Sequence, residues 1–260
     1  MDKKVLLFDL DGTLLRSDKS ISKYTLNVLH KCREQGYLIG VATARSEKNS
    51  EKFVKELCPN IVISCDGALV KYNDVYIYIA EFTVDETRNM IDTARKICGE
   101  TCEITIDTVN EHYWNYKIDP KEFDDSWGDT IYTDYGDFNN KALKFCVEIL
   151  EPNKALELAK MLNECDCVKF SDSAWYKFTQ KSATKENAVR NLCAKCKISP
   201  ANIIAFGDDL VDMGMLRFCG KGIAMGNAVD EVKNIADLVI GSNDDDGIAD
   251  YLAESFMELL

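Results

Sequence analysis

Short apolar runs alternate with amphipathic stretches at both ends of the chain, and each run is followed by polar residues. The apolar runs cover residues 5–8, 37–42, 61–64, 203–206 and 222–225. The stretches between them, such as 22–35, place apolar residues on one side of a helix. A strand that is apolar on both faces and leads into a helix is typical of a parallel sheet covered on both sides. We therefore predict an α/β fold.

The middle of the chain has a different rhythm, and its last two strands are separated only by a short polar turn. We expect helices over 84–98 and 153–165, and strands over 102–107, 112–116, 142–149, 168–172 and 175–179. Such a turn favours antiparallel pairing. We predict a discontinuous core of residues 1–82 and 180–260, with an α+β domain of residues 83–179 inserted into it.

Polar residues follow four of the predicted core strands where each strand ends. They are Asp9 and Asp11 after the first strand; Thr43, Ala44 and Arg45 after the second; Asp208, Asp209 and Asp212 after strand 203–206; and Asn227 after strand 222–225. Ligands of open parallel sheets bind at the carboxyl ends of the strands. We therefore expect these residues to gather at one edge of the sheet.

The residue types at this edge favour phosphate chemistry with a metal ion. Asp9 and Asp208 would repel each other unless a cation lay between them, and carboxylate ligands without His or Cys favour Mg²⁺. One carboxylate can attack phosphorus while Asp11 transfers protons. Lys185 stands near the start of a predicted helix, where a cation and the helix dipole both attract phosphate.

Four motifs occur in the order known from one enzyme family: DLDGTLL at 9–15, ATAR at 42–45, Lys185, and GDDLVDMGML at 207–216. In this set the chain resembles the haloacid dehalogenase (HAD) superfamily of phosphatases. The ending at 222–249 is similar to the Cof-like subgroup, whose members carry a large α/β cap between the second and third motifs. The resemblance implies a Rossmann-like parallel sheet core (HAD-like) with an inserted α+β cap domain that sets substrate specificity.

The resemblance also implies a role for each matching residue. Asp9 is the nucleophile and a metal ligand, and Asp11 is the general acid/base and a further metal ligand through its backbone carbonyl. Asp208 completes the protein ligands of Mg²⁺, with Asp212 supporting the metal site. Thr43, Ala44, Arg45, Lys185 and Asn227 are the implied phosphate-binding residues.

Three departures from the family pattern stand close to these motifs. The family usually has Asn where this chain has Val211, Gly where Ala44 stands, and Asn-Gly-Ala where Asp66-Gly67-Ala68 stands. The change at Val211 removes a hydrogen-bonding group near the implied metal and phosphate. It spares every residue with a covalent or proton-transfer role.

Composition and net charge indicate which kinds of molecule the protein is expected to bind. Hydrophobic residues make up 46% and charged residues 29%, which is the balance of a globular protein. A net charge of −13 repels nucleic acid and anionic membranes, so we expect neither as a partner. No signal-peptide or membrane-span pattern is present, which predicts a cytoplasmic protein with reduced thiols among its eleven cysteines. We expect a monomer or homodimer that acts on a small phosphorylated metabolite.

Several residues have a structural alternative. Thr43 could cap a helix, Arg45 could form a salt bridge, and Asp209 and Asp212 could be helix caps. The CxxC of Cys193 and Cys196 suits packing better than zinc or redox chemistry, because no second pair or His is near. The acidic stretch 119–137 reads first as a solvated loop. We expect the aromatic side chains of the middle segment to serve in packing rather than in a pocket that selects the substrate. They are Trp114, Trp127, Trp175 and Tyr176.

Three functions remain open from the sequence. The first is hydrolysis of a small phosphomonoester such as a sugar phosphate, a nucleotide or a phosphorylated cofactor, which the proton donor Asp11 favours. The second is a phosphomutase built on the same core. The third is a catalytically weak sensor of a phosphorylated ligand, suggested by Val211.

Overall fold

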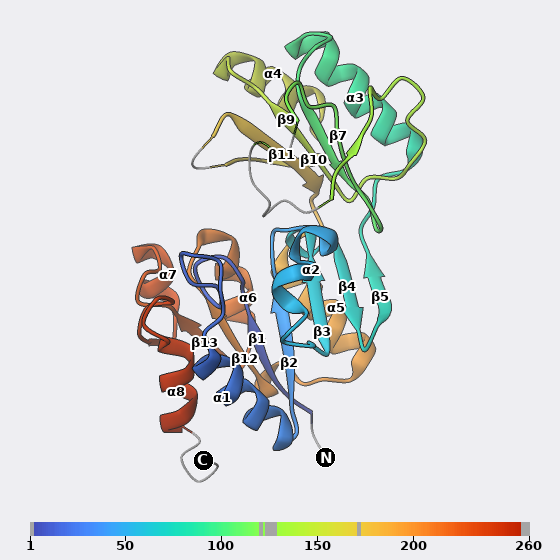
Figure 1. Ribbon diagram of the computed structural model, residues 1–260. Coiled ribbons are helices and arrows are strands. Elements are labelled where there is room, and N and C mark those ends of the chain that lie inside the picture. Colours follow the sequence, from blue (N-terminus) through green and yellow to red (C-terminus); the bar gives the residue numbers. More distant parts are fainter. Residues whose placement is uncertain (1–2, 120–121, 123–128, 171–172, 256–260) are drawn as a thin grey trace. The chain divides into compact units, whose positions relative to one another are not determined.

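The computed structural model describes residues 3–119, 122, 129–170 and 173–255 (Figure 1). By its internal contacts the chain divides into two compact units. The core unit consists of residues 1–44, 50–78 and 184–260, and the insert unit of residues 45–49 and 79–183. Across the described ranges, no helix is both long and apolar enough to cross a membrane.

The core unit contains one sheet of eight strands. In spatial order they are β14 (Leu238–Val239), β13 (Lys221–Ala224), β12 (Ile203–Gly207), β1 (Lys4–Phe8), β2 (Tyr37–Ala42), β3 (Ile61–Ser64), β4 (Leu69–Tyr72) and β5 (Val75–Ile79). The pairs from β14 to β3 are parallel, and β4 runs antiparallel to β3. This arrangement confirms the predicted α/β class.

Helices cover both faces of this sheet, which is why its central strands are apolar throughout (Figure 1). The helices of the core unit are α1 (Lys23–Glu34), α5 (Lys185–Cys196), α6 (Met213–Phe218), α7 (Asp230–Ile235) and α8 (Gly247–Ser255). Helix α1 packs beside α8, and α5 packs beside α6. The short α2 (Glu47–Val54) follows β2, and single turns of 3-10 helix cover Cys65–Gly67, Pro200–Asn202 and Leu210–Asp212.

The register of the central strands places the polar residues that follow them at one level. Phe8 of β1 pairs with Phe206 of β12 on one side and with Val41 of β2 on the other. Asp9 therefore emerges beside the ends of both neighbouring strands, and its backbone N–H donates to Phe206 O at 3.0 Å. The sheet itself thus positions the loops that carry the motifs.

Within the residues that the structure describes, the insert unit contains a six-stranded sheet and two α-helices that follow its own strands and loops. Its strands, in spatial order, are β10 (Cys165–Lys169), β11 (Trp175–Gln180), β9 (Lys144–Glu148), β6 (Ile104–Asp107), β7 (His112–Trp114) and β8 (Ile131–Tyr132). Helices α3 (Val84–Cys98) and α4 (Pro152–Met161) pack their apolar residues on one face, against a cluster that includes Phe145, Val147 and Phe178. Alternation along the strands turns Lys144 and Lys177 to the opposite face.

Three buried polar side chains lie in one row across that opposite face. Asp107 of β6 pairs in register with His112 of β7 and with Lys144 of β9. His112 Nδ1 donates to Asp107 Oδ1 at 2.7 Å, and Lys144 Nζ donates to Asp107 Oδ2 at 2.8 Å. Burial alone would raise the pKa of Asp107, but the neighbouring Lys144 and His112 outweigh it and hold the pKa well below its usual range.

Several element boundaries differ from the sequence-based predictions. The hairpin of β4 and β5 was not predicted; its turn residues Asn73 and Asp74 both have positive φ, as a two-residue hairpin turn requires. Strand β10 begins at Cys165 rather than residue 168, because Cys165 and Cys167 pack against the insert's core. Helix α4 correspondingly ends at Met161. Trp127, residues 171–172 and part of the acidic stretch lie outside the described residues.

Replacing Asp107 by Asn should destabilise the protein by about 3–5 kcal/mol at pH 7, because Lys144 would keep a buried charge without its partner. Since folding lowers this pKa, the stabilisation is fully present above about pH 4 and is lost as the pH falls through the folded-state pKa. Urea unfolding of both proteins between pH 3 and pH 8 measures the difference. A difference that stayed constant down to pH 3 would contradict the assigned ion pair.

Candidate active site

Asp9 and Lys185 form the centre of the polar cluster at the carboxyl ends of the central strands of the core sheet. Lys185 Nζ lies 2.5 Å from Asp9 Oδ1 and 2.6 Å from Asp212 Oδ1. Lys185 is only 1% exposed although it carries a charge. A lysine this deeply buried is stable only when carboxylates surround it, so the two aspartates and the lysine depend on one another.

The start of helix α5 fixes where this lysine lies. Thr184 caps the helix by accepting a hydrogen bond from Asn187 N at 3.1 Å, and Lys185 is the first helical residue. The turn at Gly67 packs directly on this cap, because a Cβ on Gly67 would lie 2.3 Å from Thr184 O. Gly67 also has a φ of +104°, which favours glycine. The backbone therefore sets the approach of Lys185 to Asp9.

Asp212 links the lysine to the loop that carries Asp208. Its Oδ1 accepts from Lys185, and its Oδ2 accepts from the backbone N–H groups of Asp208 and Asp209 at 3.0 and 3.1 Å. Asp212 is fully buried. Both of its oxygens thus accept hydrogen bonds, Oδ1 from the lysine and Oδ2 from the loop backbone.

Asp208 faces the turn that follows β1. Thr13 Oγ1 donates to Asp208 Oδ1 at 2.5 Å. A Cβ on Gly12 would lie 2.3 Å from Asp208 Oδ2, and Gly12 has a φ of +84°. Only glycine allows this close approach, so the Asp-Gly-Thr sequence at 11–13 is needed for the geometry around Asp208.

The site carries an excess of negative charge. Three carboxylates each offer a ligand atom, and these atoms lie within 4.8 Å of one another: Asp9, Asp208 and Asp212. Lys185 supplies the ammonium group of the ion pairs described above. Burial raises the pKa of Asp9 well above its usual range and that of Asp208 to about 6. The charge of Lys185 opposes the shift at Asp9, and the hydrogen bond from Thr13 opposes it at Asp208. The carboxylates raise the pKa of Lys185 despite its burial, so it stays charged.

A hard divalent cation fits this donor set. The ligand atoms are carboxylate oxygens, which Mg²⁺ prefers, and two excess negative charges would be balanced by such an ion. The hydrogen bonds at Asp9 and Asp208 described above use Oδ1 of each residue. Asp9 and Asp208 are the better candidates for direct ligation, since Asp212 uses both oxygens to hold Lys185 and the loop.

Asp11 lies on the turn after β1 and is partly exposed. Its Oδ1 accepts an ion-paired hydrogen bond from Lys19 Nζ at 2.8 Å. Asn227, predicted near the phosphate, donates from Nδ2 to Gly12 O at 2.7 Å and accepts at Oδ1 from Asn243 N at 3.1 Å. Asn227 thus lies against the same turn.

The second motif follows β2 on the other side of β1. Thr43 is buried; its N–H donates to Ile63 O at 2.8 Å, and its own O accepts from Asp66 N at 3.1 Å. Ala44 follows it within the core unit, whereas Arg45 groups with the insert unit. Phosphate contacts of Thr43, Ala44 and Arg45 remain predictions.

Two residues of the site were not singled out from the sequence. Thr13 holds Asp208, and its signal was its place inside the DLDGT motif. Lys19 holds Asp11, and nothing in its spacing indicated this, because the contact depends on how the loop after the motif folds back.

Comparisons with known proteins identify a family and several relatives of this chain. The family described as haloacid dehalogenase-like hydrolases matches residues 6–252. The 5-amino-6-(5-phospho-D-ribitylamino)uracil phosphatase YitU of Bacillus subtilis is 24% identical over 97% of each chain. Phosphatase YwpJ of the same organism is 25% identical, covering 95% of this chain and 97% of its own.

Solved structures show the same fold. A haloacid dehalogenase-like hydrolase from Bacteroides thetaiotaomicron superposes with a TM-score of 0.86 at 23% identity, over 98% of this chain and 100% of the other. A sugar phosphatase of HAD subclass IIB superposes with a TM-score of 0.80 at 22% identity, over 99% and 100%.

Replacing Lys185 by Met should lower the free energy of unfolding by about 3–5 kcal/mol at pH 7, because Asp9 and Asp212 would lose their shared counter-charge. Lys195→Met, in the same helix but exposed, is the control and should cost about 1 kcal/mol or less. Urea unfolding without added metal measures both. Equal losses in the two variants would show that Lys185 is not the counter-charge of the cluster.

Proposed function

Because the chain belongs to the haloacid dehalogenase-like hydrolases, in the Cof-like subgroup, and is a phosphoric monoester hydrolase, we propose that it works through an aspartyl-phosphate on Asp9 with the help of Mg²⁺. The observation that supports this most is the buried arrangement of Asp9, Lys185 and Asp208 at the end of the central strand. A nucleophilic carboxylate, a fixed cation and an acidic metal site are the groups that such a reaction requires.

In the first half of the reaction, Asp9 forms a bond to phosphorus as the bond from phosphorus to the leaving oxygen breaks. A proton passes from the Asp11 carboxyl group to that oxygen, so the product leaves as a neutral alcohol. Lys185, which lies 2.5 Å from the nucleophile, offsets charge on the phosphoryl oxygens. Thr43, with neighbouring backbone amides, is proposed to hold the same oxygens.

In the second half, water attacks phosphorus and gives its proton to the Asp11 carboxylate. The bond between phosphorus and Asp9 breaks, and its electron pair returns to the Asp9 carboxylate. Bound Mg²⁺, held by Asp9, Asp208 and the backbone carbonyl of Asp11, would neutralise charge on the phosphoryl group. Asp212 keeps Lys185 and the Asp208 loop in place throughout.

The substrate is proposed to be a small phosphomonoester: a sugar phosphate, a nucleotide or a phosphorylated cofactor. The relative YitU, whose name gives a phosphorylated ribitylaminouracil as its substrate, supports including heterocyclic esters among the candidates. The residues placed in the cluster come from the core unit, so we propose that the insert unit selects the alcohol part.

Phosphate release from a panel of phosphomonoesters should require both Mg²⁺ and Asp9. Asp9→Asn should lower turnover by more than about a hundredfold, because an amide cannot form the phosphoenzyme. Asp209→Asn, which changes a neighbouring exposed carboxylate in the same way, is the control and should retain most activity. A phosphomutase would instead need a bisphosphate activator. Mg²⁺-dependent ligand binding without any Asp9-dependent release would favour the sensor.

Val211 is the departure from the family pattern most relevant to the rate. It is 39% exposed, in the single turn that ends at Asp212. Val211→Asn should raise kcat about three- to tenfold, since one added hydrogen bond is worth about 1 kcal/mol. Leu210→Asn, at the neighbouring exposed position, should not raise it. Steady-state kinetics on the best ester of the panel measures kcat for both variants. An unchanged kcat in Val211→Asn would show that position 211 does not limit the rate.

A further inference from the structure

The loop that follows the first motif folds into a tight turn at residues 16–20. Arg16 N donates to Ser20 O at 2.9 Å, and Lys19 N donates to Arg16 O at 2.8 Å. Lys19 has a φ of +65°, a conformation that residues other than glycine rarely adopt. Asp18 Oδ1 accepts from both N and Oγ of Ser20, which supports the turn further. These hydrogen bonds therefore fix the backbone conformation from which the Lys19 side chain extends.

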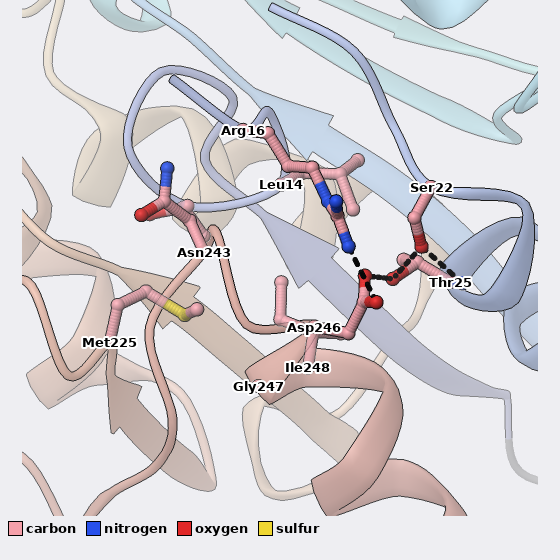
Figure 2. A pocket seen from close by; sticks show the side chains of 10 residues that line it. Leu14, Arg16, Ser22, Thr25, Met225, Asn243, Asp246, Gly247 and Ile248 are labelled. Atoms are coloured by element: carbon pink, nitrogen blue, oxygen red, sulfur yellow. Dashed lines mark hydrogen bonds and ion pairs between the residues drawn. The ribbon is translucent and has the colours of Figure 1, made fainter. Parts of the chain in front are cut away.

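A second loop, at residues 242–246, anchors this turn. Arg16 Nη2 lies 2.6 Å from Asp246 Oδ2, and Asp246 Oδ1 accepts from Thr25 Oγ1 at 3.1 Å (Figure 2). Ser17 donates to Asp244 twice, from N at 2.8 Å and from Oγ at 2.7 Å. The turn is thus tied to the start of α1 and to the segment before α8.

The anchored turn brings Lys19 to Asp11. Lys19 Nζ lies 2.8 Å from Asp11 Oδ1, and both side chains are partly exposed, at 45% and 36%. An ion pair this exposed contributes little to folding. Yet the turn that presents Lys19 is held by the Arg16–Asp246 ion pair and by the hydrogen bonds from Ser17 to Asp244. The turn at residues 16–20 is therefore held firmly although the Lys19–Asp11 contact that it presents adds little to the stability of the fold.

We propose that Lys19 is a positioning residue that holds the general acid/base Asp11 in its working orientation, and that the Arg16–Asp246 pair keeps Lys19 in place. This inference rests on the proposed function. An ammonium group can only donate, so Asp11 Oδ1 acts as an acceptor whenever Lys19 is bound to it. Lys19 thereby fixes the direction in which the Asp11 carboxyl group faces.

This role predicts a dependence on the leaving group. An ester with a basic leaving oxygen needs a proton from Asp11 as its bond to phosphorus breaks, whereas p-nitrophenolate leaves without one. Loss of Lys19 lets Asp11 adopt other orientations, so proton transfer slows while attack by Asp9 continues. A merely structural role of Lys19 would slow all esters alike.

The experiment compares kcat and KM for phenyl phosphates whose leaving groups span a range of basicity. Lys19→Met should lower kcat about tenfold for phenyl phosphate and about twofold or less for p-nitrophenyl phosphate, with little change in KM. Lys19→Arg should restore most of the difference. Lys23→Met, at an exposed lysine that begins α1, should behave like the wild type.

A double-variant cycle tests the anchor. Arg16→Met should change the leaving-group dependence in the same direction as Lys19→Met, and it should add little when the two are combined. An equal loss of kcat across the series, or no loss, in Lys19→Met would overturn the inference.

A measurement without turnover separates this inference from the proposed function. The ¹³Cγ resonance of Asp11 should move in Lys19→Met and stay in place in Lys23→Met. If it does not move in Lys19→Met, the inference is overturned whatever the kinetics show. Wild-type enzyme that releases phosphate from no ester in an Asp9-dependent way would instead overturn the proposed function.

Discussion

The buried contact of Lys185 with Asp9 and Asp212 is the interaction on which the site depends. One ammonium group joins the end of β1, the start of α5 and the loop after β12, three elements far apart in the sequence. None of the three side chains could be buried with its charge alone. The fold can therefore bury them only when all three elements are in place, which couples correct folding of the core unit to assembly of the reactive carboxylate.

The proposed mechanism makes opposite demands on the two aspartates of the first motif. Asp9 must be rigid, and the sheet, Lys185 and burial make it so. In the proposed mechanism Asp11 exchanges protons with both an alcohol and water, which requires access to solvent. The two-residue spacing meets both demands because the chain leaves the sheet between them. A partly exposed Asp11 then needs a contact outside the sheet to keep its orientation, and the loop after the motif supplies one.

The sequence alone predicted the parallel core and the gathering of Asp9, Asp208 and Asp212, because strand ends in a parallel sheet share an edge. Lys185 was predicted to bind phosphate from its place at the start of a helix and from the family resemblance. Contacts made by loops were out of reach. The pairing of Lys19 with Asp11 depends on a left-handed residue and on Asp246, more than 220 residues away. The hairpin of β4 and β5 was missed because its turn is Asn-Asp and lacks the glycine that usually signals such turns.

The row formed by His112, Asp107 and Lys144 has a consequence for how the insert's strands choose their partners. Side chains alternate along a strand, so a slip of β9 by one residue would turn Lys144 toward Phe178 and the helices, and would turn Phe145 to the polar face. Two penalties would then arise together: a charge buried among aromatic rings and an aspartate deprived of its cation. The row of His112, Asp107 and Lys144 therefore favours the native register of β9 over a register shifted by one residue.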